Sequence, residues 1–236
     1  MISDALRTDI EVWAAKRDSN PVFAAARAGK LSRGVITRYI ANVTHMIRLT
    51  PGHLVCAREA ATAGGDAKLA SFFAHKLEEE TGHAVWGEAD LVALEAVKAA
   101  PMLTQATPAI EQLAAFLPEM IADDPALYLT YLAFTEYITV LLGPELLSLI
   151  EERNNVARSA LTVIDNHIEL DREHAEEAWG LIDDLVGDPR KITTMRAALR
   201  SIIEFFDAFA SEVVVESDRA SGVEAIATEQ RSASAA

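Results

Sequence analysis

Two histidines and an aspartate are spaced to share one face of a helix late in the chain. The stretch H-I-E-L-D-R-E-H runs from His167 to His174, inside a longer helical pattern. His167, Asp171 and His174 stand at i, i+4 and i+7, which a helix with 3.6 residues per turn projects from one side. Such imidazole and carboxylate groups can form half of a metal site. The alternative is a solvated outer face, because the surrounding residues are rich in charge.

A second candidate is the acidic run E-E-E-T-G-H. Glu80 and His83 are spaced i, i+3, and Glu79 and His83 are spaced i, i+4, so either glutamate can share a helix face with the histidine. The alternative is again a solvated face. Lys76 lies four residues before Glu80, a spacing typical of an ordinary surface pair.

Glu136 is the third candidate, because it stands alone in the apolar stretch Y-L-T-Y-L-A-F-T-E-Y-I-T-V-L-L. No Lys or Arg lies within two helical turns on either side. A buried carboxylate without a partner costs several kcal/mol or becomes neutral. We therefore expect protonation, a cation from another helix, or a metal ion at Glu136. The alternative is a side chain that reaches solvent on the outer face of its helix.

Helix breakers separate the segments that must position these residues, and no segment shows the alternation of a strand. Ser32 and Asp66 are predicted N-caps. The expected helices cover about 4–17, 21–29, 33–63 with a kink or break at Thr50-Pro51-Gly52, 67–99, 108–121, a helix that starts at Asp123-Asp124-Pro125 and passes Gly143-Pro144, 156–186, and 190–215. These seven or eight helices predict one all-α, bundle-like domain over residues 1–217. Residues 218–236 have no apolar period, and we expect them to be disordered.

Composition excludes several classes of protein. The net charge is −15, and no basic stripe indicates a nucleic-acid partner. Cys56 is the single cysteine, which excludes a disulfide framework and a thiolate-rich metal site within one chain. The N-terminus does not read as a signal peptide, and the apolar runs are too short to predict a membrane span. We therefore expect a soluble protein of the cytoplasm.

Taken together, the three candidates predict a metal centre. Bundle sites for two metals draw a Glu-x-x-His pair from some helices and single glutamates from others, all pointing inward. Oxygen and nitrogen ligands without thiolate favour iron or manganese. The predicted ligands are Glu80, His83, Glu136, His167, Asp171 and His174, with Glu79 as the alternative to Glu80.

The H-x-x-x-D-x-x-H motif, the E-x-x-H motif and the single Glu136 between them resemble those of the haem-oxygenase-like di-iron oxidases and oxygenases. The early stretch N-P-V-F-A-A-A-R-A-G-K-L-S-R-G-V-I-T-R-Y-I-A-N-V-T-H resembles the first helices of that superfamily, and the resemblance covers about 20–215. It implies a haem-oxygenase-like fold, shared with the TenA thiaminases and pyrroloquinoline-quinone synthase. It also implies two Fe(II) ions, or an iron and manganese pair, held by the six residues. Dioxygen would be the co-substrate, and a fatty acid, amino acid or amine of specialised metabolism the substrate. A homodimer and an external electron donor are compatible with this class.

Some relatives place the first glutamate two turns before the histidine, where this chain has Lys76. This is why Glu80 is assigned as the ligand. Pocket candidates lie near these motifs or on the helix interrupted by Pro51, and for each the alternative is ordinary core packing. They are Tyr39, His45, His53, Cys56, Trp86 and Tyr137.

Three other functions are considered. A metal-free TenA-like hydrolase would need Cys56 as its nucleophile. A non-catalytic helical binding protein would use the charged residues only as a surface. A ferritin-like di-iron protein usually carries two E-x-x-H motifs, whereas this chain has one.

Overall fold

The computed structural model describes residues 1–95 and 104–234, and these residues form nine α-helices and no strand. The helices are α1 (Ile2–Ala14), α2 (Pro21–Arg27), α3 (Arg33–Ala63), α4 (Ala67–Glu80), α5 (Ala84–Ala93), α6 (Pro108–Asp123), α7 (Tyr128–Asn154), α8 (Thr162–Val186) and α9 (Ile192–Ser234). The all-α prediction is therefore confirmed. Ser32 and Asp66 cap α3 and α4 as predicted, since their side chains accept hydrogen bonds from the backbone N–H groups of Val35 and Leu69.

The helix expected over 67–99 is wrong in one respect that matters for function. The structure divides it into α4 and α5, because Thr81 is extended and Gly82 adopts a φ of +97°. Glycine has no Cβ and reaches this left-handed conformation without strain. An isolated glycine is usually tolerated within a helical pattern, so Gly82 was not expected to end one. The end of the predicted helix, 96–99, lies outside the described residues.

Helix α3 covers the predicted range and continues through Pro51 to Ala63, so a break at this proline is wrong. Proline removes one hydrogen bond of the helix without ending it here. The start of α8 differs from the predicted one. Helix α8 begins at Thr162, six residues after the predicted start at 156. Asn155 has a left-handed φ of 54°, and a 3-10 turn at Arg158–Ala160 precedes α8.

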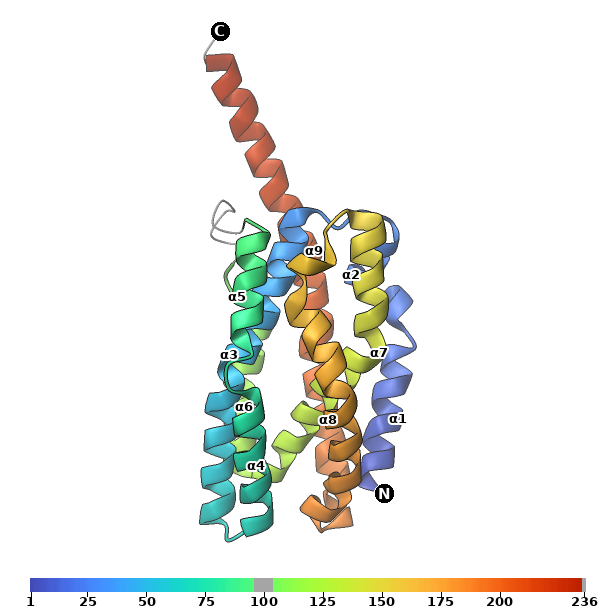
Figure 1. Cartoon of the computed structure of the whole chain (residues 1–236), viewed down its shortest axis with the longest axis vertical. Coiled ribbons are helices and arrows are strands. Elements are labelled where there is room, and N and C mark those ends of the chain that lie inside the picture. Colours follow the sequence, from blue (N-terminus) through green and yellow to red (C-terminus); the bar gives the residue numbers. More distant parts are fainter. Residues whose placement is uncertain (96–103, 235–236) are drawn as a thin grey trace.

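Helix α7 runs obliquely through the bundle, with α3 and α4 on one side of it and α1 on the other (Figure 1). It packs most extensively against α8, and α3 packs most extensively against α4. Helices α7 and α8 approach each other closely at Gly143, where a Cβ would lie 2.7 Å from Cγ1 of Ile168. The missing side chain thus allows the two helices that carry Glu136 and Asp171 to approach closely.

The central position of α7 explains its composition. By length and hydropathy alone, Pro125–Asn154 would pass as a membrane span, with a mean hydropathy of 1.4. The prediction that every apolar run is too short for a membrane span is therefore wrong for this segment, by length and hydropathy alone. A helix surrounded by other helices is also apolar on most sides, and residues from Tyr128 to Tyr137 are largely buried. An apolar helix at the centre of a bundle therefore meets the same criterion.

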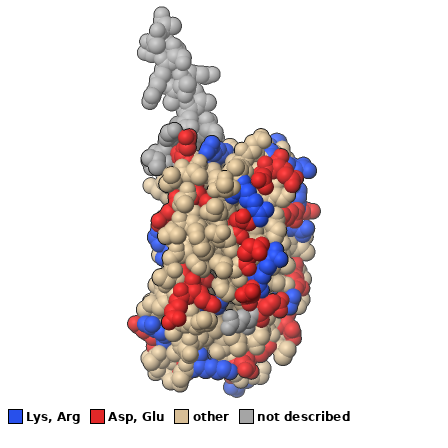
Figure 2. All heavy atoms as spheres, viewed as in Figure 1, with Lys and Arg blue, Asp and Glu red and all other residues tan. Residues whose placement is uncertain are grey.

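Helix α9 leaves the bundle and projects beyond it to Ser234 (Figure 1). The assignment of 1–217 as one domain, with a disordered tail over 218–236, stays a prediction. On the bundle, acidic and basic side chains are interspersed over the face in Figure 2. Some charged side chains form ion pairs between helices that are distant in the sequence, such as Arg196 with Asp9 and Lys68 with Asp184.

Candidate metal centre

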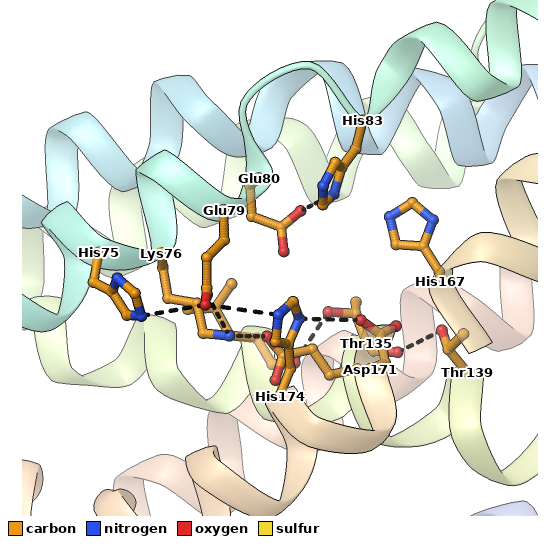
Figure 3. A network of polar contacts seen from close by, with 12 residues as sticks. His75, Lys76, Glu79, Glu80, His83, Thr135, Thr139, His167, Asp171 and His174 are labelled. Atoms are coloured by element: carbon orange, nitrogen blue, oxygen red, sulfur yellow. Dashed lines mark hydrogen bonds and ion pairs between the residues drawn. The ribbon is translucent and has the colours of Figure 1, made fainter. Parts of the chain in front are cut away.

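The six predicted ligands meet in the interior of the bundle. Glu80 and His83 flank the α4–α5 junction, and His167, Asp171 and His174 face them from α8 (Figure 3). One set of donor atoms comes from Glu80, His83 and His167, and all three lie within 4.8 Å of one another. A second set, from Glu80, Glu136 and His174, meets the same limit. The structure thus offers two groups of donors that share Glu80. We call them the first and second donor groups.

The interruption at Gly82 places His83. His83 Nδ1 lies 3.3 Å from Oε2 of Glu80, and its ring stacks on Trp86 at 4.5 Å between centroids. The same ring meets the edge of His167 at 5.3 Å. Ending α4 after Glu80 therefore lets a glutamate and a histidine from adjacent helices point at one position on α8.

His167 is oriented by its own helix. Its Nδ1 lies 2.6 Å from the backbone carbonyl of Val163, and as an N–H it donates to that oxygen. The Nε2 atom is then left to bind an ion. A hydrogen bond to the other ring nitrogen is the usual means of fixing a metal-binding histidine.

Asp90, which is not among the residues predicted from the sequence, fixes the start of α8 against α5. The buried carboxylate accepts hydrogen bonds from Thr162 N at 2.9 Å, Thr162 Oγ1 at 2.7 Å and Val163 N at 2.7 Å. It therefore satisfies backbone donors that a helix start leaves unpaired. The usable signal was an aspartate among the apolar residues of G-E-A-D-L-V-A, the same kind of signal that identified Glu136.

The surface position predicted for Lys76 is wrong. Its side chain is 0 % exposed, so it is no surface partner for Glu80. Its Nζ lies 3.2 Å from Oε1 of Glu136 and 3.1 Å from Oε2 of Glu79. Of the three ways to compensate Glu136, the structure shows a cation from another helix. The spacing contained a signal, because Lys76, Glu80 and His83 repeat the i, i+4, i+7 pattern of His167, Asp171 and His174.

Burial controls the ionisation of the carboxylates. It raises the pKa of Glu136 to about 7; Lys76 opposes the shift, and the negative charges of Asp171 and Glu80 add to it. Burial also raises the pKa of Asp171, although hydrogen bonding to His174 opposes it. Burial alone would raise the pKa of Glu80, but the contact with His83 and the nearby positive charges bring it below its usual value. The centre is thus a buried, acidic site in which several carboxylates surround the ammonium of Lys76.

Several buried oxygen and imidazole nitrogen atoms of the centre make ion pairs at most and lack a hydrogen bond among the described residues. They are Glu79 Oε2, His83 Nδ1, both carboxylate oxygens of Glu136, and His174 Nδ1. Buried polar groups are normally hydrogen-bonded, and each exception requires an explanation. Carboxylate oxygens and imidazole nitrogens are donors of the kind that iron and manganese accept.

An apolar cavity of about 190 Å³ adjoins the centre. Glu80, Glu136, His167 and Asp171 contribute to its wall, and most other lining residues are apolar side chains of α3, α7, α8 and α9. A second hollow, of about 490 Å³, shares four lining residues with it, near α1 and α2. They are Trp13, Asn20, Phe23 and Leu142. Four of the predicted ligands therefore border a space suited to a molecule with an apolar body.

Two of the predicted pocket residues lie at the cavity or beside the centre. Tyr39 lines the cavity and stacks on Phe209. Trp86 contacts the rings of His83 and His167, beside the centre.

The remaining pocket candidates are not among the described residues that line the cavity. His53 is buried and meets the ring of Tyr128, and Tyr137 donates a hydrogen bond to Glu11 at 2.7 Å. His45 is half-buried, and Cys56 is exposed. Their roles with a substrate stay predictions.

This arrangement of helices is the haem-oxygenase-like fold, as the resemblance implied. The chain is similar to a domain of unknown function with a heme oxygenase-like fold from Shewanella denitrificans, at 19% identity and a TM-score of 0.78, over 90% of this chain and 92% of that one. It is also similar to a TenA homolog from Pseudomonas syringae pv. tomato, at 15% identity and a TM-score of 0.68, over 89% and 91% of the two chains. The chain matches no known family model and no curated protein. At these identities the likeness shows the fold alone.

Proposed function

We propose that this protein is a non-haem, iron-dependent oxidase or oxygenase that uses dioxygen on a small molecule with an apolar body. The observation that carries the proposal is the meeting of Glu80, His83 and His167 within 4.8 Å at the wall of an apolar cavity. Mixed carboxylate and imidazole donors favour iron, with manganese as the alternative. The resemblance implies two ions, and the two donor groups give each a set of ligands.

The chain's own residues would have a limited task. Iron bound at the centre would pass electrons to dioxygen and so supply the oxidant. His83 and His167 would hold the ion, and the Val163 carbonyl would keep the His167 ring in place. The apolar wall would orient the substrate and exclude bulk water. Of the substrate classes considered, a fatty acid or an apolar amine suits this lining better than a polar amino acid.

The two main alternatives receive less support. A cysteine-dependent hydrolase would need a nucleophile beside the substrate, whereas Cys56 is exposed and is not among the described cavity-lining residues. A non-catalytic protein with a charged outer face would place its carboxylates in solvent, whereas Glu136 and Asp171 are buried.

Anaerobic addition of iron(II), followed by measurement of bound iron, tests the proposal. His167→Ala should lower bound iron by at least about half, because the first donor group loses one of its three members. His75→Ala is the matched control, since His75 is exposed on α4 and should leave the iron content unchanged. Oxygen consumption is then followed with a panel of fatty acids, amines and amino acids. A folded wild-type protein that binds no iron would refute the proposal.

A further inference from the structure

Lys76 brings a positive charge into the interior of the candidate centre. The whole side chain is buried, and its ammonium lies between the carboxylates of Glu136 and Glu79. Nζ lies 3.1 Å from Oε2 of Glu79 and 3.2 Å from Oε1 of Glu136, so two carboxylates stabilise the charged form of the lysine. We therefore treat Lys76 as an ammonium ion.

The ammonium pairs directly with a carboxylate that belongs to only one of the two donor groups. Glu136 belongs to the second donor group and lies 3.2 Å from Nζ of Lys76. Glu80 is shared by both groups, whereas His83 and His167 belong to the first group alone and lie away from Lys76 (Figure 3).

We propose that the ammonium of Lys76 takes the place of a second metal ion, so that the centre binds a single divalent cation at Glu80, His83 and His167. This inference rests on the proposed function, because it assumes that the first donor group binds a metal. It differs from the two-iron centre that the resemblance implies. Lys76 thereby determines how many metal ions the site holds.

Repulsion between positive charges supports a single ion. The ammonium of Lys76 lies 3.2 Å from the carboxylate of Glu136, so a second divalent ion held by Glu136 would lie close to it. Two positive charges side by side in a buried site repel each other strongly, because the dielectric constant there is low.

The packing of Lys76 supports it as well. The four-carbon stem is enclosed by the core, so the ammonium has no free path to solvent. A lysine on a helix surface could swing out when a metal arrives, because its flexible stem lies along the surface. For Lys76 this movement would require α4 to repack against its neighbours. A buried Glu136 without the ammonium would also lose its nearest positive charge.

Metal stoichiometry and Mn(II) spin resonance test the inference without any need for activity. The full chain is loaded anaerobically with Fe(II), or with Mn(II) for spectroscopy, and bound metal is measured after desalting. We expect about one ion per wild-type chain and the spectrum of isolated Mn(II), because the ammonium occupies the second position. Lys76→Met keeps the length of the side chain and removes its charge. It should bind a second ion about tenfold or more tightly than the wild type does, with a spin-coupled Mn(II) spectrum.

Lys68→Met is the matched control, because Lys68 is on the same helix but is exposed and paired with Asp184. It should leave the stoichiometry at the wild-type value. Lys76→Arg is a second variant that keeps the positive charge, and it should also remain at one ion.

Each outcome is informative. Two ions per wild-type chain would overturn the inference and leave the proposed function standing. One ion in both the wild type and a folded Lys76→Met variant would also overturn it, since the charge would then not control the second position. No ion in folded wild-type protein would instead refute the proposed function.

Discussion

Replacing Glu136 by Gln should make the metal-free protein more stable, and the gain should depend on pH. Glu136 is 4 % exposed, and both of its carboxylate oxygens lack hydrogen bonds among the described residues. Glutamine keeps the size and one oxygen acceptor for Lys76, but it cannot ionise. The variant therefore removes the cost of a buried negative charge with little change in packing.

The magnitude follows from the shift in pKa. The carboxyl group has an ordinary pKa of 4.5, and burial raises the pKa of Glu136 to about 7 in the folded protein. A group whose folded pKa is raised contributes no penalty below its unfolded pKa, where both states are protonated. Between pH 4.5 and about 7, the unfolded chain releases its proton more readily, so folding is disfavoured as the pH rises. Above this window the penalty is constant at about 3 kcal/mol, since one pKa unit corresponds to about 1.4 kcal/mol.

Urea unfolding at a series of pH values gives the required free energies. The difference between Glu136→Gln and wild type should rise from near zero at about pH 4.5 to about 3 kcal/mol at pH 8. Glu119→Gln is the control, because Glu119 is exposed on α6 and should show no such trend. Using the difference between variants cancels the titration of groups that both proteins share.

A difference that does not change with pH would refute this reasoning, since it would show that Glu136 does not titrate in the folded state near pH 7. A variant less stable than wild type at pH 8 would also refute it. Attraction between Glu136 and Lys76 would then outweigh the cost of burying the charge.

Two further predictions concern the helices that position the centre. Gly143→Ala should destabilise the protein by about 1–3 kcal/mol, because the new methyl group would overlap Ile168 of α8. Gly180→Ala should instead stabilise it by about 0.5–1 kcal/mol, because a Cβ there meets no atom within 4 Å and alanine favours a helix. Thermal or urea unfolding measures both, and equal effects of the two would contradict the close approach of α7 and α8. Asp90→Ala should cost about 2 kcal/mol by leaving donors of Thr162 and Val163 unpaired, with Asp184→Ala as an exposed control on α8. Unchanged stability of the Asp90 variant would show that these hydrogen bonds contribute nothing.

The helical pattern and the position of Glu136 could be predicted because both depend on nearby residues. Asn20, Ser32, Asp66 and Thr107 each accept a hydrogen bond from a backbone N–H at a helix start, which is a property of a few consecutive residues. Glu136 stood out because no cation is available on its own helix. Signals of this kind depend on neighbouring residues and not on how the rest of the chain folds.

The break at Gly82 could not be predicted in the same way. Gly64-Gly65 is a double glycine and was recognised as a helix end, whereas Gly82 is a single glycine after a strongly helical acidic run. A continuous helix was locally acceptable. The structure ends α4 there and places His83 against His167 and Trp86. The end of α4 is therefore associated with contacts between segments that are distant in the sequence. Such contacts cannot be predicted from the residues around Gly82 alone.

The burial of Lys76 could not be predicted either, because its partner Glu136 is distant in the sequence. In the sequence, its nearest opposite charges are the glutamates of its own helix, and this spacing predicts an ion pair on the helix surface. In the structure, its face of α4 points into the bundle, where Glu136 arrives from a segment 60 residues away. The sequence predicts Lys76 as a surface residue and Glu136 as a carboxylate without a nearby cation. The structure pairs the two residues, so the carboxylate explains why the ammonium can be buried, and the ammonium is the cation that Glu136 lacks on its own helix. The proposal of one metal ion and a lysine depends on this contact between α4 and α7, which neither helix indicates by itself.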